Sequence, residues 1–302
     1  MLRKWKFALL AVLPVFFMAA CDADENTMDG ENGKLRLYMT DAPIDTDGIK
    51  NVFITFTEIQ YHTQGGEWST FDEFDEPVKL DLLELTRGET ELLGFFEMDP
   101  GTYTQIRFML DAPDRGQGPP TTPGSYLVFE DDSTTPLFVP SGGQSGYKAV
   151  GQFVIPANGV AEVTADFDVR RSVVRAGNSG RYILKPVIRL ISSEVSGRIA
   201  GDVFNIPEDT GIMVYAYEAG TYTEDEAADP AEEEVRFPGA ENSDKVCEEN
   251  RYHLDFLEEG VYDLVVTSTD AEGEFIEVLG MIENVPVETG KTTELDIDIE
   301  EL

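Results

Sequence analysis

The chain has 302 residues, of which 59 are acidic and 22 are basic, so its formal net charge is −37 at pH 7. Nucleic-acid binding needs clustered Lys and Arg, and a negative field of this strength excludes nucleic acid as a partner. A hydrophobic content of 41%, with 18 Phe and 11 Tyr, indicates packed cores and excludes a disordered chain.

The first 20 residues have the features of a secretory signal peptide. Arg3, Lys4 and Lys6 precede an unbroken apolar run at residues 7–18, and two alanines then lead to Cys21. A run of this length is too short for a bilayer core, which requires about 20 residues as a helix. The segment Met18-Ala-Ala-Cys21 resembles the bacterial lipobox, in which the cysteine is acylated and becomes the first residue of the mature protein. The sequence therefore predicts a lipid anchor, such as palmitate, at Cys21.

A lipoprotein of this kind is expected in the bacterial cell envelope, anchored in a membrane and facing the periplasm or the cell surface. Residues 21–33 are acidic and nearly free of apolar groups, so they are predicted to form a lipidated, flexible tether. An acidic stretch after the cysteine resembles a surface-export signal in some bacteria, whereas Asp22 resembles an inner-membrane retention signal in others. Both locations stay open. With Cys21 lipidated, Cys247 is left alone and no intramolecular disulfide is predicted.

Residues 34–192 alternate between apolar and polar side chains, which is typical of strands with one face in the core. The clearest alternating sets are Leu35, Leu37 and Met39; Ile106, Phe108 and Leu110; and Val163, Ala165, Phe167 and Val169. In the segment from Val52 to Tyr61 the apolar face changes side, which predicts a β-bulge near Thr57 and Glu58. Helical turns are expected only at Leu80–Leu85 and Arg170–Arg175.

A domain boundary is predicted near residue 192, where a second series of strands begins and the charge changes. Residues 34–192 have 14 basic and 23 acidic groups, whereas residues 193–302 have 5 and 31. The segment Glu224–Asn250 is acidic and weakly apolar, so it is predicted to be a mobile loop between strands. The expected fold is all-β: a signal peptide at 1–20, the tether at 21–33, and two antiparallel β-sandwich domains of immunoglobulin- or transthyretin-like Greek-key type at 34–192 and 193–302.

The pattern Gly-x-Tyr occurs five times, about five times more often than composition alone predicts. Two copies follow a short acidic loop, at Gly101–Tyr103 and Gly260–Tyr262. In β-sandwiches a tyrosine at such a corner returns its hydroxyl to nearby backbone. These tyrosines are therefore expected to stabilise the scaffold.

Seven motifs follow one another along the first part of the chain: Leu37-Tyr-Met-Thr-Asp-Ala-Pro43, Val52-Phe-Ile-Thr-Phe-Thr-Glu-Ile59, Leu80-Asp-Leu-Leu-Glu-Leu85, Gly101-Thr-Tyr-Thr-Gln-Ile-Arg107, Asp166-Phe-Asp168, Ser172-Val-Val174 and Tyr182-Ile-Leu-Lys-Pro-Val187. Their order and spacing resemble the bacterial lipoprotein domain known as domain of unknown function 4382. The resemblance covers about residues 34–190 and implies a β-rich lipoprotein domain without an assigned activity. Residues 195–300 resemble transthyretin-like or carboxypeptidase-regulatory-like sandwiches through Gly260-Val-Tyr262 and their strand rhythm.

The sequence offers no catalytic motif, so the protein is predicted not to be an enzyme, and no catalytic residue is assigned. The chain has two histidines, His62 and His253, and lacks the metalloprotease, serine-hydrolase and nucleotide-binding signatures. Cys247 lies in the acidic stretch 244–249, where carboxylates work against a reactive thiolate. Carboxylate pairs for glycoside hydrolysis are too common in this chain to carry information.

The best candidate for a ligand site is a calcium loop formed by Asp41, Asp45 and Asp47 before Gly48. Calcium takes six to eight oxygen ligands, and alternate acids before a glycine turn can present several of them. The loop lacks the bidentate glutamate of a full calcium motif. The alternative is that Asp41-Ala-Pro43 ends a strand, with Asp capping the turn and Pro stopping the ladder.

The sequence thus predicts a non-catalytic lipoprotein of the cell envelope that presents β-sandwich domains for binding or structural roles. Its expected partners are the membrane, through the lipid on Cys21, and a protein or glycan of the envelope. No cofactor is expected, calcium excepted. The alternatives are a calcium-stabilised surface adhesion module and an envelope enzyme of unrecognised type.

Overall fold

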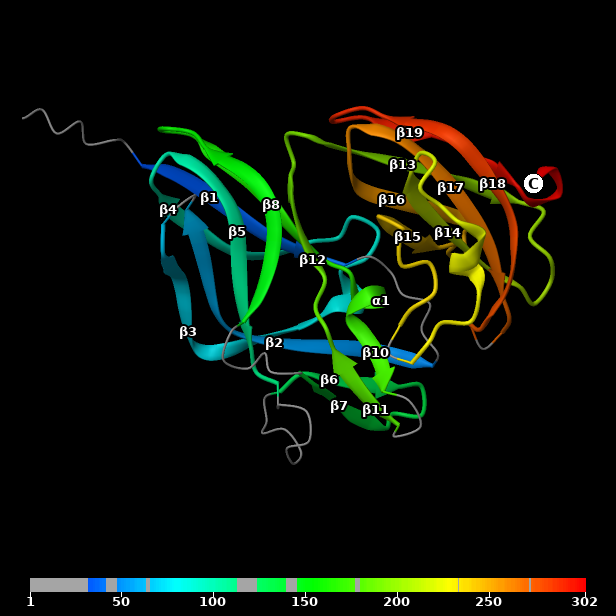
Figure 1. The fold of residues 1–302 in the computed structure, drawn as a ribbon, viewed down its shortest axis with the longest axis horizontal. Coiled ribbons are helices and arrows are strands. Elements are labelled where there is room, and N and C mark those ends of the chain that lie inside the picture. The colour runs from blue at the N-terminus through cyan, green and yellow to red at the C-terminus, as the bar shows by residue number, and fades with distance from the viewer. Residues whose placement is uncertain are drawn as a thin grey trace, which may run out of the picture. The chain divides into compact units, whose positions relative to one another are not determined.

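The computed structural model describes residues 32–41, 48–63, 66–112, 124–139, 146–176, 180–232, 234–271 and 273–302. The segment Glu31–Leu302 forms one compact unit. Within it, residues 32–192 and residues 193–302 each surround hydrophobic clusters of their own, and we call them the first and second lobes (Figure 1).

The first lobe consists of twelve strands joined into one sheet, with two short helical turns. The elements are β1 Gly33–Thr40, β2 Ile49–Thr63, β3 Trp68–Asp81, η1 Leu82–Glu84, β4 Glu91–Met98, β5 Gly101–Leu110, β6 Tyr126–Phe129, β7 Thr134–Phe138, β8 Tyr147–Ile155, β9 Val160–Phe167, α1 Val169–Ser172, β10 Val173–Ala176, β11 Arg181–Leu184 and β12 Ile188–Ser192. Eleven of the strands are neighbours in the order β10, β11, β7, β6, β2, β5, β8, β12, β9, β1 and β4, and the twelfth, β3, pairs with β2.

The sheet of the first lobe curls around its own core, so that strands distant in the pairing order face each other. Phe71 of β3 stacks on Phe96 of β4 with ring centroids 4.6 Å apart. The alternating apolar residues predicted for β1, β5 and β9 all lie in this core. The predicted bulge is present in β2, where the register shifts between Phe56 and Glu58. Because of this shift, both Phe56 and Ile59 are buried.

The second lobe is a sandwich of two four-stranded sheets. The elements are β13 Ser196–Phe204, β14 Gly211–Glu218, η3 Glu224–Ala227, β15 Asn242–Lys245, β16 Arg251–Glu258, β17 Gly260–Thr269, β18 Phe275–Val287, β19 Thr292–Glu294, β20 Ile297–Asp298 and η4 Ile299–Glu301. One sheet has the order β16, β13 and β19, with β20 also paired to β13, and the other has the order β15, β14, β17 and β18.

A segment between β14 and β15 covers the outer face of the second sheet, and we call residues 219–241 the strap. Phe237 of the strap is fully buried, and its ring lies 4.5 Å from the ring of Tyr215 and 5.6 Å from that of Phe275. Sequence analysis predicted a mobile loop between strands over Glu224–Asn250, but this segment contains η3 and strand β15. The apolar anchor was missed because a single buried aromatic in an acidic segment gives no periodic signal.

Both predicted tyrosine corners are present, one in each lobe. The hydroxyl of Tyr103 donates to the carbonyl of Asp99 at 2.9 Å, and that of Tyr262 donates to the carbonyl of Glu258 at 3.0 Å. In each case the acceptor lies four residues before the tyrosine: Asp99 lies in the turn between β4 and β5, and Glu258 is the last residue of β16. The corner therefore ties the backbone ahead of the turn to the strand that follows it.

The all-β fold with several antiparallel sheets is confirmed. Five pairings between described strands are parallel, including that of β1 with β9. The division at residue 192 into independently folding domains stays a prediction. None of the helices in the described part of the chain has the length and apolar character needed to cross a membrane.

Candidate functional site at the junction of the two lobes

The end of β9 places two arginines at the edge of the first lobe. Asp168 caps the short helix α1, since its side chain accepts a hydrogen bond from the Arg171 backbone at 2.9 Å. The Asp168 side chain also accepts from Arg171 Nε at 2.5 Å and from Arg170 Nη2 at 3.4 Å. This buried carboxylate therefore ends the strand and fixes the direction of Arg170 and Arg171.

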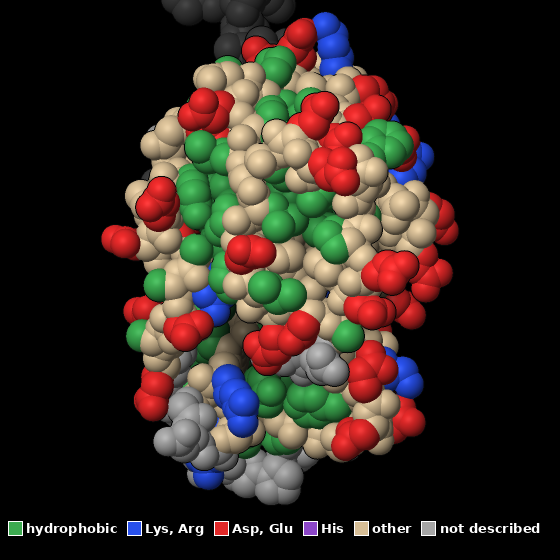
Figure 2. Space-filling view, turned by 90° about the vertical axis from the view of Figure 1, so that its right-hand side faces the viewer, with side chains coloured by type: hydrophobic (Ala, Val, Ile, Leu, Met, Phe, Trp, Pro, Cys, Tyr) green, Lys and Arg blue, Asp and Glu red, His purple; other side chains and the backbone are tan. Residues whose placement is uncertain are grey.

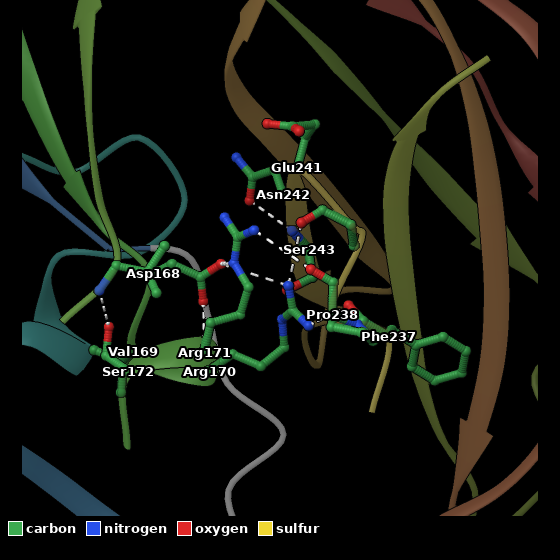
Figure 3. Close-up of polar contacts among 12 residues, drawn as sticks. Asp168, Val169, Arg170, Arg171, Ser172, Phe237, Pro238, Glu241, Asn242 and Ser243 are labelled. Atoms are coloured by element: carbon green, nitrogen blue, oxygen red, sulfur yellow. Dashed lines mark hydrogen bonds and ion pairs between the residues drawn. The ribbon is translucent and has the colours of Figure 1, made fainter. Parts of the chain in front are cut away.

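Arg170 crosses from the first lobe into the strap of the second (Figure 3). Its Nη1 donates to the carbonyls of Phe237 at 2.6 Å and Arg236 at 3.1 Å, and its Nη2 donates to that of Ala240 at 3.3 Å. The guanidinium also lies 5.7 Å from the ring centroid of Tyr215. Only 7% of Arg170 is exposed, so the carbonyls and Asp168 replace the water that its charge has lost.

A second arginine, Arg189 of β12, also joins the lobes. It donates to Asp166 of β9 at 2.5 Å and to Glu241 of the strap at 2.9 Å. Burial opposes the charge of Arg189, but Asp166 and Glu241 outweigh it and hold the arginine's pKa above its usual value. Burial raises the pKa of Asp166, while Arg189 acts in the opposite direction. The pair is therefore a structural ion pair across β9 and β12 that extends to the second lobe.

Asp41, the first residue of the predicted calcium loop, lies at the end of β1 and is 4% exposed. Its Oδ1 accepts a hydrogen bond from the backbone of Val169 at 3.0 Å, and its Oδ2 has no hydrogen-bond partner among the described residues. Burial raises the pKa of Asp41 well above its ordinary value. Asp45 and Asp47 lie outside the described residues, so the calcium loop stays a prediction. Within the described part of the chain, no group of three or more His, Cys, Asp or Glu residues is arranged to hold a metal ion.

A small cavity lies at this junction, with a volume of about 10 Å³. Asp41 and Asp166 line it from the first lobe, and His253 and Asp255 line it from the second. A cavity of this volume has room for about one water molecule. A water molecule there can donate hydrogen bonds to the unpaired carboxylate oxygens of Asp41 and Asp166. The cavity is too small to admit a substrate.

Asp244 of β15 provides a further contact between the lobes. Its carboxylate is fully buried, accepts from the backbone of His253 at 2.8 Å, and lies 3.7 Å from Nε of Arg87 in the first lobe. Burial raises the pKa of Asp244 to about 7, although the His253 N–H and Arg87 act in the opposite direction. Arg87 also donates to the carbonyl of Lys245 at 3.3 Å.

The comparison with protein families gives a match that lies within the first lobe. Residues 32–186 match the family described as a domain of unknown function (DUF4382). The chain belongs to the DUF4382 family. The matched segment includes Asp41, Asp166 and the cap of α1, whereas Arg189 and the strap lie beyond it. The DUF4382 domain thus supplies one half of the junction, and the C-terminal part of the chain supplies the other.

The comparison with solved structures gives matches of low identity. The chain is similar to the Bacillus anthracis TIE protein, with 10% identity, 89% of this chain and 34% of that chain covered, and a TM-score of 0.21. It thus spans about a third of that protein. It is also similar to GBS52, the minor pilin of Streptococcus agalactiae (10% identity, 87% and 94% covered, TM-score 0.21), and to the fimbrial anchor protein Mfa2 of Porphyromonas gingivalis (10%, 88% and 90%, 0.21). No curated protein matches the chain.

The histidines and the thiol considered from the sequence lie in different places of the DUF4382 protein. His62 of β2 lies beside Trp68, with ring centroids 5.2 Å apart, and His253 lines the junction cavity. Cys247 is free and partly exposed, and its hydrogen bond to Glu249 lowers the pKa of that carboxyl. Cys21 lies outside the described residues.

Sequence reasoning missed the residues that form the junction. Arg170, Arg189 and Glu241 were assigned no role, although the consecutive arginines after Asp166-Phe-Asp168 are conspicuous in so acidic a chain. That signal marks a buried ionic contact, because arginine in a fork geometry suits carboxylates and carbonyls in low dielectric surroundings.

Proposed function

We propose that this protein is a lipid-anchored, non-catalytic component of the bacterial cell envelope, which presents two joined β lobes to a binding partner. The observation that carries the proposal is the contact of Arg170 with the strap. Three backbone carbonyls of the strap and Asp168 of the first lobe engage one buried guanidinium, so this charge serves to join the two lobes. Catalysis would need charged groups that are accessible at a cleft. The charged groups of this junction instead form structural contacts.

The chemistry of the junction agrees with a structural role. Asp166 and Asp168 face arginines, Asp41 accepts from the backbone of α1, and the cavity between them has the volume of about one water. A catalytic carboxylate pair needs space for a substrate between the two groups. The alternative of an envelope enzyme therefore gains no support from this cluster.

The anchor rests on the sequence of residues 1–21, which lie outside the described part of the chain. The first strand begins at Gly33, and the intervening tether reaches at most about 40 Å when extended. This length suits lobes that stand close to a membrane surface. The anchored lobes would face the periplasm or the cell surface.

The second lobe offers a surface for a partner. Figure 2 shows a face where hydrophobic side chains gather and acidic side chains surround them, with few basic ones. Exposed apolar residues of this lobe include Val261, Ile276 and Met281, which are 45%, 52% and 40% exposed. Apolar groups with a charged rim are typical of interaction surfaces. An envelope protein or glycan is the partner class that we propose.

Membrane fractionation of Cys21→Ala tests the anchor. We expect the wild-type protein in the membrane fraction and in the detergent phase of a phase-separation assay, and the variant in the aqueous phase with an unchanged melting temperature. Cys247→Ala is the matched control, since it removes the other thiol and keeps the anchor. A Cys21→Ala protein that remains in the membrane fraction would refute the lipoprotein proposal.

A further inference from the structure

The first lobe has an uncharged, partly apolar end at the connection between β8 and β9. Residues 149–161 contain no charged side chain, although 27% of the whole chain is charged. They form the end of β8, a turn and the start of β9, and we call them the β8–β9 tip. Val154 and Val160, on either side of the turn, are 56% and 39% exposed, and the turn residues 156–158 are exposed as well.

The first strand of the lobe starts directly against this tip (Figure 1). The backbone N–H of Lys34 donates to the carbonyl of Gly159 at 3.0 Å, and a side chain on Gly33 would collide with Ile155. Lys34 is also paired with Val160 in the parallel ladder of β1 and β9. The chain that follows Cys21 therefore enters the first lobe at the β8–β9 tip.

An exposed aromatic ring beside the tip contacts two basic side chains. Phe95 of β4 is 50% exposed, and its ring centroid lies 5.3 Å from Lys34 Nζ and 5.5 Å from the guanidinium carbon of Arg36. Lys and Arg side chains can lay their alkyl stems on an apolar surface while their charges reach water or lipid headgroups. Aromatic rings beside basic groups are typical of surfaces that lie at a membrane interface.

The charges around the tip nearly balance, in contrast to those of the whole chain. Arg36 pairs with Glu162 at 2.8 Å, and Lys34 lies opposite Glu97 in the ladder of β1 and β4. Asp99 lies in the turn after β4. The chain has a formal net charge of −37, so anionic lipid headgroups repel the protein as a whole. An apolar, nearly neutral end can approach a bilayer at a lower electrostatic cost.

We infer that the β8–β9 tip and Phe95 rest on the lipid bilayer that holds the anchor. This contact rests on the proposed function, since it needs the lipid on Cys21. The chain between Cys21 and Gly33 reaches at most about 40 Å, so the bilayer is always near the tip. A few exposed valines and one ring bind a bilayer weakly by themselves. The anchor makes this binding intramolecular, and a weak contact then becomes effective.

Fluorescence quenching by lipid tests this contact in the lipidated full chain. In a Cys247→Ala background, Val154→Cys supplies one thiol for a nitrobenzoxadiazole label, because the sulfur of Cys21 is occupied by lipid. The labelled protein is reconstituted into vesicles of phosphatidylcholine and phosphatidylethanolamine that contain a nitroxide-labelled lipid. We expect the label at position 154 to shift its emission to shorter wavelength and to lose most of its intensity to the nitroxide.

Ile276→Cys is the matched control, because Ile276 is 52% exposed and belongs to β18 of the second lobe. Its label should keep its emission. Phe95→Glu combined with Val160→Glu adds two negative charges beside the tip, and it should restore the emission of the label at position 154. Flotation of the vesicles in a density gradient reports on the anchor separately, and melting temperatures confirm that the variants fold.

Three results would overturn the inference. A protein that floats with the vesicles and keeps the emission at position 154 would leave the anchor standing and place the tip away from the bilayer. A label with shifted emission and no quenching would show that protein, and not lipid, covers the tip. A protein that does not float would refute the anchor and this contact together. Quenching at position 154, its absence at position 276 and its loss in the variant with two added charges would support the contact.

Discussion

Arg170 Nη1 donates to the carbonyl oxygen of Phe237 at 2.6 Å, across the junction between the two lobes. Phe237 is itself the buried anchor of the strap, so one arginine connects α1 of the DUF4382 domain to the core of the second lobe. Contacts of this kind leave buried carbonyls without donors when the arginine is removed.

Replacing Arg170 should therefore destabilise the whole chain. We expect Arg170→Ala to lose about 3–5 kcal/mol in the free energy of unfolding, the usual cost of removing one partner of a buried ionic contact. Arg170→Lys should recover only part of this loss, because an ammonium group cannot reproduce the fork. Urea unfolding of the purified variants measures the loss, with the exposed Arg175→Ala as control. A loss below about 1 kcal/mol for Arg170→Ala would contradict this role.

Stability should fall as the pH rises from about 4 to 7. Burial raises the pKa of Asp244 to about 7 in the folded chain, so the folded state holds a proton that the unfolded state has released. Protons bound in excess by the folded state mean that the free energy of unfolding decreases with rising pH across this window. Burial also raises the pKa of Asp41, Asp166 and Asp255, with the same sign.

The variant Asp244→Asn isolates the contribution of that group. It should remove a pH-dependent difference on the order of 4 kcal/mol between pH 4 and 7, which is what a shift of about three units represents. Chemical unfolding at several pH values provides the measurement, and Asp132→Asn at an exposed ion pair is the control. Parallel pH profiles of wild type and Asp244→Asn would show that Asp244 is not responsible.

Each tyrosine corner should stabilise its own lobe. Tyr103→Phe and Tyr262→Phe each remove one hydroxyl that donates to a backbone carbonyl four residues earlier, at an expected cost of about 1 kcal/mol. Because the two corners lie in different lobes, the double variant should lose the sum. Tyr126→Phe, where the hydroxyl accepts from an exposed lysine at 3.3 Å, should change stability less. Equal losses of stability in all three variants would contradict a special role for the corners.

Calcium chloride should raise the melting temperature more than sodium chloride at the same ionic strength. The acidic side chains of residues 193–302 repel one another strongly. A divalent ion can bridge two carboxylates, whereas a monovalent ion only screens them. The expected excess is about 2 °C or more. Asp45→Asn with Asp47→Asn tests whether the Asp41 loop takes part. Equal shifts in both salts would reduce the effect to screening.

The strand pattern could be read from the sequence because side chains alternate between core and water. Val163, Ala165 and Phe167 of β9 lie in the core as predicted. The same alternation placed Thr164 and Asp166 in water, yet they are buried, Asp166 beside the arginine that reaches the strap. The alternation of side chains along a strand shows which face lies in the core of its own lobe. It gives no information about a second lobe that covers the other face.

The candidate site was predicted only in part for the same reason. Asp41 was selected for its loop, but its carboxylate turns inward to α1, which follows it by more than a hundred residues. Arg170 and Phe237 are 67 residues apart in the sequence, which is also too far for a local motif. Contacts over such separations depend on how the lobes pack, which local propensity and periodicity do not specify.

Calorimetric unfolding of the full chain tests the central claim, that buried charges join the two lobes into one body. The wild-type protein should unfold in a single transition whose calorimetric and van't Hoff enthalpies agree. In Arg170→Ala that transition should divide into two, one for each lobe. Two separate transitions in the wild-type protein would contradict the claim, because the lobes would then unfold without regard to the contacts between them.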